Sequence, residues 1–257
     1  TFIHEMGHVF GLEDYYDYSS QYEPAGGFSM QDMNVGGHDP YSCLQLGWAK
    51  PYIPTETVTL TINDFQSSGD MVLLTPSWNS YDSPFDEYIL VELYSPTGLN
   101  KFDSDYTYDV SYPKGPSTVG IRVWHVDARL LYVNSDQQFS ASQVTTNPSY
   151  NSYYGVYKMM ANTYYSSSAS DYITYLGQSY ANYNELQLIR NNTSTTYKPK
   201  NVLSASDLFI EGSTFSMSAY KNQFVNSGKL NSNIYLGWTF TVNSISGCSA
   251  SITFTKA

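Results

Sequence analysis

The 257-residue sequence predicts an α+β chain that is predominantly β, with its helices near the N-terminus. Helix-type spacing and turn residues fill residues 1–50, whereas apolar and polar side chains alternate from Pro51 onward, as they do in half-buried strands. Aromatic residues make up 16% of the chain and charged residues only 14%, a composition that suits strands. We therefore expect two regions, residues 1–50 and residues 51–257.

Residues 1–11 predict a helix that carries two histidines on one face. His4 and His8 are four residues apart, so both imidazoles can point at one ion. Neutral imidazole binds zinc at about 2.0–2.1 Å, and a catalytic zinc keeps one position open for water. Glu5 lies beside the first histidine, from where it could take a proton from that water. Gly11 can end the helix, because glycine adopts left-handed backbone angles at little cost.

A turn at Gly11 would bring the chain back toward the histidines, which makes Asp14 the third ligand that we predict. Three residues are alternatives for this place: Asp17, Glu23 and His38. Asp14 and Asp17 could also be solvated turn residues or ligands of Ca²⁺, which prefers oxygen donors. The bare pattern HExxH arises by chance, but HExxHxxGxxD is more specific and holds two of the four histidines of the chain.

Residues 12–37 are rich in proline and glycine and predict a long turn-rich segment. Asp39 and Pro40 are typical of a helix start, because aspartate caps helices and proline is favoured at the first helical position. The helix is expected over residues 41–48, and Gly47 would end it. For His38, just before this helix, a hydrogen bond near the helix start is favoured over a ligand role.

Nine segments beyond Pro51 predict strands, and the clearest read EYILVELY and VGIRVWHV. They cover residues 58–62, 71–75, 87–94, 119–126, 154–160, 185–190, 208–217, 238–245 and 250–255. Gly, Pro, Asn and Ser clusters separate them, so an antiparallel β-sandwich is the expected architecture. Residues 135–152 and 164–170 are rich in Ser, Tyr and Asn and are expected to be long loops.

Two later features could bind metal, but a structural role is favoured for each. His125 shares a strand face with Ile121 and Val123 and is expected to be a buried histidine with a hydrogen-bond partner such as Asp127. Three aspartates, Asp103, Asp105 and Asp109, have a spacing that could surround Ca²⁺. They lack the glycine and the terminal glutamate of an EF-hand, so an exposed acidic loop is the favoured interpretation.

The charge balance excludes some partners. With 12 basic and 23 acidic residues the formal net charge is −11, which argues against nucleic acid or an anionic membrane as a partner. No run is long and apolar enough to span a bilayer. Cys43 and Cys248 could form one disulfide or remain two thiols.

The stretch HEMGHVFGLEDYYD resembles the zinc motif of the immune inhibitor A family, secreted bacterial metallopeptidases of the metzincin type. Residues 26–48, GGFSMQDMNVGGHDPYSCLQLGW, resemble the Met-turn of that family followed by a helix that ends in Leu-Gly-Trp. Met30 matches the methionine that lies beneath the zinc, with Met33 as the alternative. The sequence departs from many relatives at Asp14, where many metzincins have histidine, and at Ser29, where many relatives have aspartate.

The resemblance implies the C-terminal half of a zincin-type catalytic domain in residues 1–50, followed by an accessory β-sandwich in residues 51–257. His4, His8 and Asp14 would hold Zn²⁺, Glu5 would be the general base, and Tyr15 or Tyr16 could stabilise an oxyanion. The expected activity is hydrolysis of peptide bonds in extracellular proteins by a secreted or cell-surface bacterial protein.

Because the chain starts three residues before its first predicted ligand, we expect the N-terminal part of its catalytic domain to be a missing partner. The competing interpretation is a binding or adhesion module, in which a non-catalytic sandwich carries a remnant zinc motif.

Overall fold

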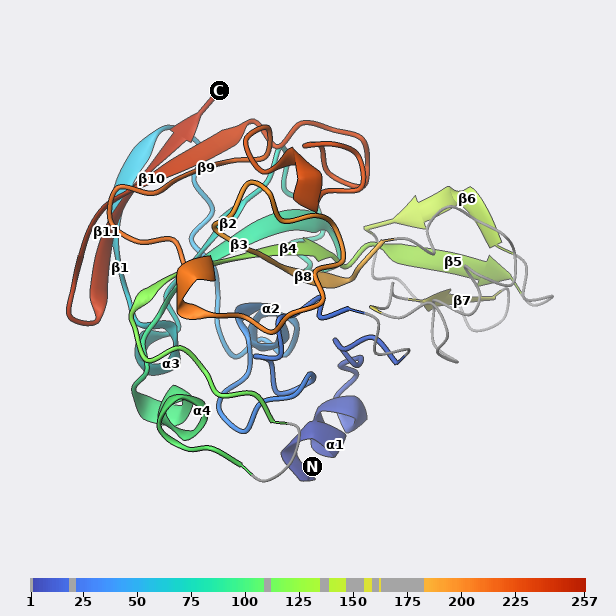
Figure 1. The fold of residues 1–257 in the computed structure, drawn as a ribbon. Coiled ribbons are helices and arrows are strands. Elements are labelled where there is room, and N and C mark those ends of the chain that lie inside the picture. Colours follow the sequence, from blue (N-terminus) through green and yellow to red (C-terminus); the bar gives the residue numbers. More distant parts are fainter. Residues whose placement is uncertain are drawn as a thin grey trace.

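A computed structural model describes residues 2–18, 22–108, 112–134, 139–146, 155–158, 162 and 183–257. These residues are predominantly β, with two four-stranded antiparallel sheets, one three-stranded antiparallel sheet and short helices (Figure 1). The sheets have the strand orders β1-β11-β10-β9, β2-β3-β4-β8 and β6-β5-β7. The fold class predicted from period-two patterning is therefore correct in its coarse form.

The first sheet contains β1 (Val58–Asn63), β9 (Thr214–Ser216), β10 (Trp238–Ser246) and β11 (Ser249–Lys256). The second, which we call the central sheet, contains β2 (Met71–Leu74), β3 (Glu87–Tyr94), β4 (Gly120–Asp127) and β8 (Leu186–Ile189). The third contains β5 (Leu130–Asn134), β6 (Phe139–Thr145) and β7 (Gly155–Lys158). The α-helices are α1 (Phe2–Val9), α2 (Pro40–Gln45), α3 (Phe65–Ser68) and α4 (Lys101–Asp105).

The central sheet is buried on both faces. All eight residues of β3 and all eight of β4 are buried, and Val91 of β3 lies opposite Val123 of β4. Because alternate side chains of a strand point to opposite faces, β3 contributes to two separate hydrophobic clusters. This explains why EYILVELY lacks the clean polar alternation of a strand with one wet face.

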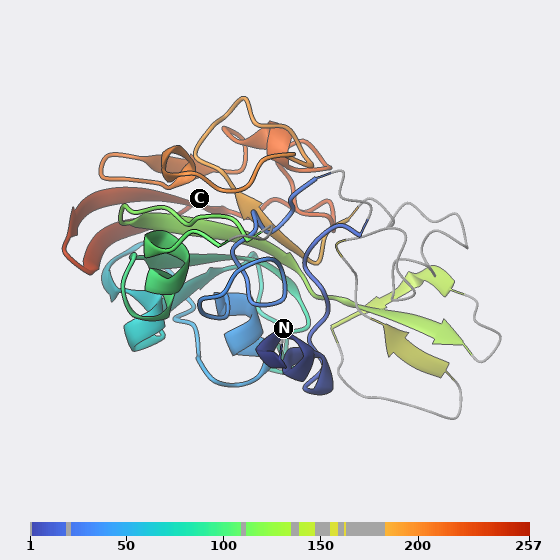
Figure 2. The same cartoon turned by 60° about the horizontal axis from the view of Figure 1, so that its bottom comes forward.

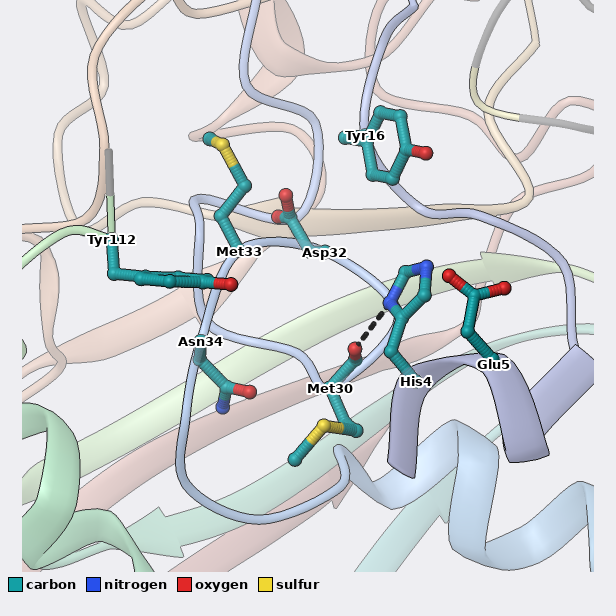
Figure 3. A pocket seen from close by; sticks show the side chains of 8 residues that line it. All are labelled: His4, Glu5, Tyr16, Met30, Asp32, Met33, Asn34 and Tyr112. Carbon is teal, nitrogen blue, oxygen red and sulfur yellow. Dashed lines mark hydrogen bonds between the residues drawn. The ribbon is translucent and has the colours of Figure 1, made fainter. Parts of the chain in front are cut away.

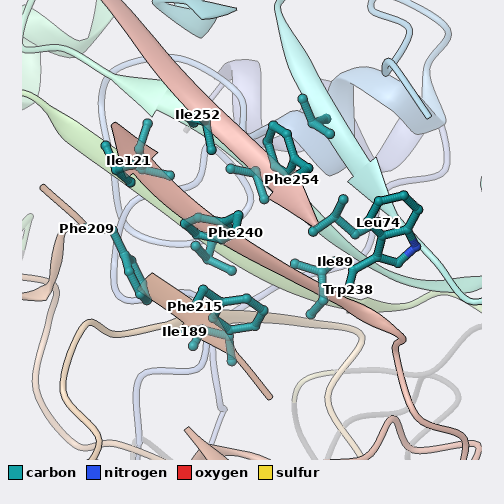
Figure 4. Close-up of a cluster of buried hydrophobic side chains, with 14 of the residues drawn as sticks. Leu74, Ile89, Ile121, Ile189, Phe209, Phe215, Trp238, Phe240, Ile252 and Phe254 are labelled. Atoms are coloured by element: carbon teal, nitrogen blue, oxygen red, sulfur yellow. The ribbon is translucent and has the colours of Figure 1, made fainter. Parts of the chain in front are cut away.

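The first hydrophobic cluster joins the two four-stranded sheets (Figure 4). Ile89 and Val91 of β3 belong to it together with Phe240 of β10 and Phe254 of β11. The indole nitrogen of Trp238 is satisfied by the carbonyl oxygen of Thr75 at 3.0 Å. Removing this much aromatic and aliphatic surface from water is the main stabilising contribution to such a pair of sheets.

The second hydrophobic cluster lies on the opposite face of the central sheet and includes the N-terminal segment. Tyr15, Phe28 and Tyr41 pack there against sheet residues such as Leu90 and Trp124. Figures 1 and 2 show α1 and α2 on the side of the central sheet that faces away from β10 and β11. The predicted division at residue 50 stays a prediction, but one buried cluster extends across that position.

Two segments differ from the sequence prediction. The strand expected over residues 208–217 is reduced to Thr214–Ser216, because Gly212 at φ +81° turns the chain inside it. The loop expected over residues 135–152 contains the strand β6, whose sequence FSASQVT has few of the apolar residues that predict strands. The other expected loop, residues 164–170, and Asp109 lie outside the described residues.

The predicted short helix after Asp39 is present but ends at Gln45, before the expected Trp48. The Asp39 carboxylate accepts the backbone N–H of Ser42 at 2.9 Å, so Asp39 is its N-cap as expected. Cys43 and Cys248 are free thiols. Within the described ranges, every helix is too short or too polar to cross a membrane.

Candidate metal centre

The end of α1 turns the chain back over its own histidines. Gly11 has φ +94°, and its backbone N–H donates to the carbonyl of His8 at 3.0 Å. The N–H of Leu12 donates to the carbonyl of Gly7 at 3.0 Å. These two bonds form a Schellman motif, which needs a left-handed residue and therefore favours glycine. The expected stop at Gly11 is confirmed.

The turn brings Asp14 to both histidines of α1. Nε2 of His4 lies 3.0 Å and Nε2 of His8 lies 3.2 Å from the same carboxylate oxygen, Oδ1 of Asp14. One candidate ligand atom of each residue lies within 4.8 Å of the others. Among the described residues this is the one cluster of three His, Cys, Asp or Glu side chains with that property.

Hydrogen bonds at the Nδ1 atoms fix the orientation of the two histidine rings. Nδ1 of His4 contacts the carbonyl oxygen of Met30 and Nδ1 of His8 that of Leu12, each at 2.8 Å. A carbonyl oxygen only accepts, so both Nδ1 atoms carry the proton. In a neutral ring Nε2 then has a free lone pair, and both lone pairs face Asp14. A backbone acceptor orients the rings of many metal-bound histidines in the same way, so these two residues are candidate ligands.

Three acceptor atoms cannot converge stably without a positive charge between them. Oδ1 of Asp14 is buried and receives no hydrogen bond while both imidazoles are neutral, so either a proton on an imidazole or a metal ion must neutralise it. Zinc fits the donor set of two imidazoles and a carboxylate, which leaves one position open. Two ligands about 2.0–2.1 Å from a tetrahedral zinc lie roughly 3.3–3.4 Å apart. The observed His–Asp separations of 3.0 and 3.2 Å are slightly shorter and are also those of direct hydrogen bonds between imidazole and carboxylate.

The electrostatics of the cluster favour a positive species beside Asp14. The hydrogen bond with Asp14 is the main reason why the pKa of His4 is raised. Burial alone would raise the pKa of Asp14, but contacts with His4 and Tyr18 and the charge of His8 outweigh burial and lower it. The Tyr18 hydroxyl donates to Oδ2 of Asp14, so the second carboxylate oxygen is already held by the protein.

The three alternative ligands lie outside this cluster. Asp17 is buried and has interactions of its own. One carboxylate oxygen of Glu23 is buried without a hydrogen bond, and burial raises the pKa of this side chain. His38 packs edge-to-face on Trp48 with 5.4 Å between ring centroids, and burial lowers its pKa.

The predicted Met-turn contacts the candidate site through its backbone. Met30 supplies the carbonyl that binds His4, while Figure 3 shows its side chain directed away from that ring. The side chain that packs beneath α1 belongs to Gln31. Its amide nitrogen donates to the carbonyl of His4 at 3.2 Å, and a Cβ on Gly7 would lie 2.2 Å from its Oε1. Glycine at position 7 therefore allows this close approach, and any larger residue would have to displace the Gln31 side chain.

Ser29, which stands where many immune inhibitor A relatives have aspartate, has a structural role. Its hydroxyl donates to Oδ2 of Asp39 at 2.6 Å and accepts the backbone N–H of Gln31 at 3.2 Å. Asp39 also caps α2. The serine thus ties the loop that holds His4 to the start of α2.

A cavity of about 260 Å³ adjoins the histidine cluster. His4, Glu5 and Tyr16 line one part of it, and Glu5 is exposed (Figure 3). The ring of Tyr16 stacks on His4 with 6.3 Å between centroids. Tyr15, the other candidate for oxyanion stabilisation, is fully buried in the second hydrophobic cluster, so Tyr16 is the better placed of the two.

The later candidates have structural partners. Nε2 of His125 lies 2.9 Å from Oε1 of Glu87, so the histidine is structural as expected, but its partner is Glu87 rather than Asp127. Asp103 is buried, which corrects the exposed-loop interpretation for this residue. Its two oxygens accept the backbone N–H groups of Val35 and Gly36 at 2.8 and 3.1 Å. Ca²⁺ binding by Asp103, Asp105 and Asp109, the less favoured interpretation, stays untested.

Sequence reasoning missed three residues of this site: Tyr18, Gln31 and Asp32. Tyr18 is four residues after Asp14, a spacing with no established motif. Gln31 and Asp32 lie between two methionines and look like ordinary turn residues. Gln31 and Asp32 reach the site because the loop from Phe28 to Asn34 folds against α1, and Tyr18 reaches Asp14 from the segment after Gly11. Spacing along the chain does not reveal these contacts.

The chain matches no protein-family model, no curated protein and no solved structure. The resemblance to immune inhibitor A metallopeptidases therefore rests on the motif residues alone.

Proposed function

We propose that this chain carries the zinc-binding half of a metallopeptidase that hydrolyses peptide bonds of extracellular proteins. The observation that supports it best is the convergence of the His4 and His8 Nε2 atoms on Asp14. Both rings are already oriented by carbonyl acceptors, and the Asp14 oxygen between them receives no hydrogen bond while both rings are neutral. Such pre-orientation is typical of a metal centre.

His4, His8 and Asp14 would hold the ion. When bound, zinc supplies Lewis-acid chemistry that polarises a carbonyl and makes water more acidic. Glu5 lies beside His4 at the cavity and is exposed, so its carboxylate can accept a proton from water and pass it to a leaving amine. The Tyr16 hydroxyl can donate to an oxygen that becomes negative, because its ring lines the same cavity.

Two further parts of the proposal concern the fold. Residues 51–257 would form an accessory β-sandwich, which is supported by the hydrophobic cluster shared between the two four-stranded sheets. The other half of the catalytic domain would cover α1. Four large apolar side chains on or next to this short helix are 56–77% exposed: Phe2, Ile3, Val9 and Phe10. Exposed apolar groups gathered on one element often mark a contact surface.

The location proposed with this activity is the bacterial cell surface or the extracellular medium. An acidic chain with few charged residues and a peptidase motif of a secreted family supports it.

The activity test uses the longest natural chain that contains these residues, incubated with zinc and an unfolded protein substrate. Glu5→Gln should reduce cleavage by at least about 100-fold, since general acid–base groups contribute about 10²–10⁴ in rate. Zinc binding should be retained. Glu211→Gln, the same change at an exposed position, should cleave normally. Cleavage at an unchanged rate by Glu5→Gln would refute the role of Glu5.

A non-catalytic binding or adhesion module is the second candidate. It is favoured by the first hydrophobic cluster, whose members lie between residues 58 and 254 and include none of the described residues of 1–50. On this account the sheets fold around their own core and the motif is a remnant. Absence of cleavage by the zinc-loaded natural chain would favour this alternative.

A further inference from the structure

The cavity beside His4 and Glu5 presents hydrogen-bond acceptors that have no donor. Oδ1 of Asp32 and Oδ1 of Asn34 are both buried without a partner, and both residues line the cavity. Asp32 is only 7% exposed and Asn34 8% exposed. Their other polar atoms are engaged, since Oδ2 of Asp32 accepts the N–H of Gly27 at 2.8 Å and the Asn34 amide donates to Gly37.

The remaining walls of this cavity are apolar or aromatic. Met30, Met33 and Tyr112 line it together with Tyr16. Figure 3 shows Tyr112 on the side opposite His4 and Glu5, with the Asp32 carboxylate between Met33 and Tyr16 in that view. A buried acceptor among apolar walls matches a side chain that has a long aliphatic stem and a cationic end.

We propose that this cavity binds a lysine or arginine side chain of the peptide substrate, with Asp32 as the residue that determines this preference. The inference rests on the proposed peptidase function for its biological meaning. Ammonium and guanidinium groups carry only donors, so either group could donate to the unpaired oxygen of Asp32. A substrate chain that places such a side chain here would have its backbone next to His4 and Glu5.

The environment of Asp32 supports a cationic ligand over a neutral one. Burial, with a smaller contribution from the charge of Glu23, raises the pKa of Asp32 to about 8, so this side chain is mostly protonated at neutral pH in the free protein. A cation beside it would favour the carboxylate and lower its pKa, so that cation binding would release a proton, whereas a neutral apolar side chain would leave the pKa raised.

The first test measures binding to the whole chain by titration calorimetry, with n-butylamine and n-butylguanidine as probes and n-butanol as the neutral control. We expect both cations to bind more tightly than butanol, and Asp32→Asn to weaken them by at least about tenfold, as for a lost charged hydrogen bond. Asp105→Asn, an acidic residue outside the cavity whose side chain is 47% exposed, should leave binding unchanged. Asparagine can still accept from Gly27, and an unchanged melting temperature would verify folding.

Equal binding of the cations to wild type and Asp32→Asn would overturn the proposal, as would Asp32-dependent binding of Ca²⁺ without binding of either amine. A second test uses the natural chain and peptide pairs that differ only by lysine or norleucine next to the cleaved bond. We expect kcat/KM to favour lysine and Asp32→Asn to remove the preference. Cleavage of both peptides at equal rates would refute the role of Asp32 and leave the peptidase intact. Amine binding without any cleavage would refute the proposed peptidase function but would still support a cation-binding site at Asp32.

Discussion

The backbone carbonyl of Met30 accepts a hydrogen bond from Nδ1 of His4 at 2.8 Å. This contact joins two segments that are 26 residues apart, and it fixes which ring nitrogen of His4 is free. The same relation holds between Leu12 and His8. The turn after α1 and the loop after Phe28 therefore orient the imidazoles before any ion binds.

Tyr18→Phe tests whether the hydrogen bond from Tyr18 helps Asp14 to bind metal. The Tyr18 hydroxyl donates to Oδ2 of Asp14, and loss of such an outer partner typically weakens metal binding by about 10–100-fold. We expect a loss in this range, with little change in melting temperature because Tyr18 is exposed. Competition with a zinc-binding dye measures it. Tyr81→Phe, at another exposed tyrosine, is the control, and equal affinities in the two variants would contradict the role of Tyr18.

Gly7 and Gln31 should show strong energetic coupling. Alanine at position 7 gains about 1 kcal/mol in helix propensity. In wild type its Cβ would lie 2.2 Å from the buried Gln31 side chain, and overpacking costs about 1–3 kcal/mol. Gly7→Ala should therefore be neutral to destabilising in wild type and stabilising in a Gln31→Ala background. Urea unfolding of all four variants gives the coupling, and an equal effect of Gly7→Ala in both backgrounds would be inconsistent with this packing.

The stability of the metal-free chain should fall as the pH rises between about 4 and 8 through Asp32. Its ordinary pKa is 3.8 and burial raises the pKa to about 8 in the folded chain. The folded state therefore binds the proton more tightly over this window, and the free energy of unfolding decreases with increasing pH. Asp32→Asn should become relatively more stable toward pH 8. Urea unfolding at several pH values measures the difference, and a pH-independent difference between the two proteins would show that Asp32 does not titrate in this way.

Much of the fold could be predicted because its signals are local. Period two over Val58–Asn63 and the apolar run of Glu87–Tyr94 predict strands, and Gly11 and Asp39 indicate where helices end and begin. The sequence failed at β6, whose Ser and Gln residues look like a loop. It also failed at residues 208–217, where Gly212 turns an apolar segment.

The predicted ligands His4, His8 and Asp14 are brought together because their spacing encodes one helix face and one turn. The contacts that support them are less predictable. The contact of Gln31 with Gly7 depends on how a loop packs against α1. The contact of Tyr18 with Asp14 depends on the path of the chain after Gly11. Met30 is predicted to contact the site through its side chain, but its observed contact with His4 is made by the backbone carbonyl, which any residue type could supply.

The most direct test of the account is the zinc content per chain, measured by elemental analysis after exposure to zinc at neutral pH and removal of free metal. We predict about one zinc per chain, lost in His8→Ala and retained in His125→Gln, because His125 is a partner of Glu87. The His125 variant should lose stability without losing metal. Zinc that is absent from the wild-type chain, or that persists in His8→Ala, would contradict a metal centre at His4, His8 and Asp14.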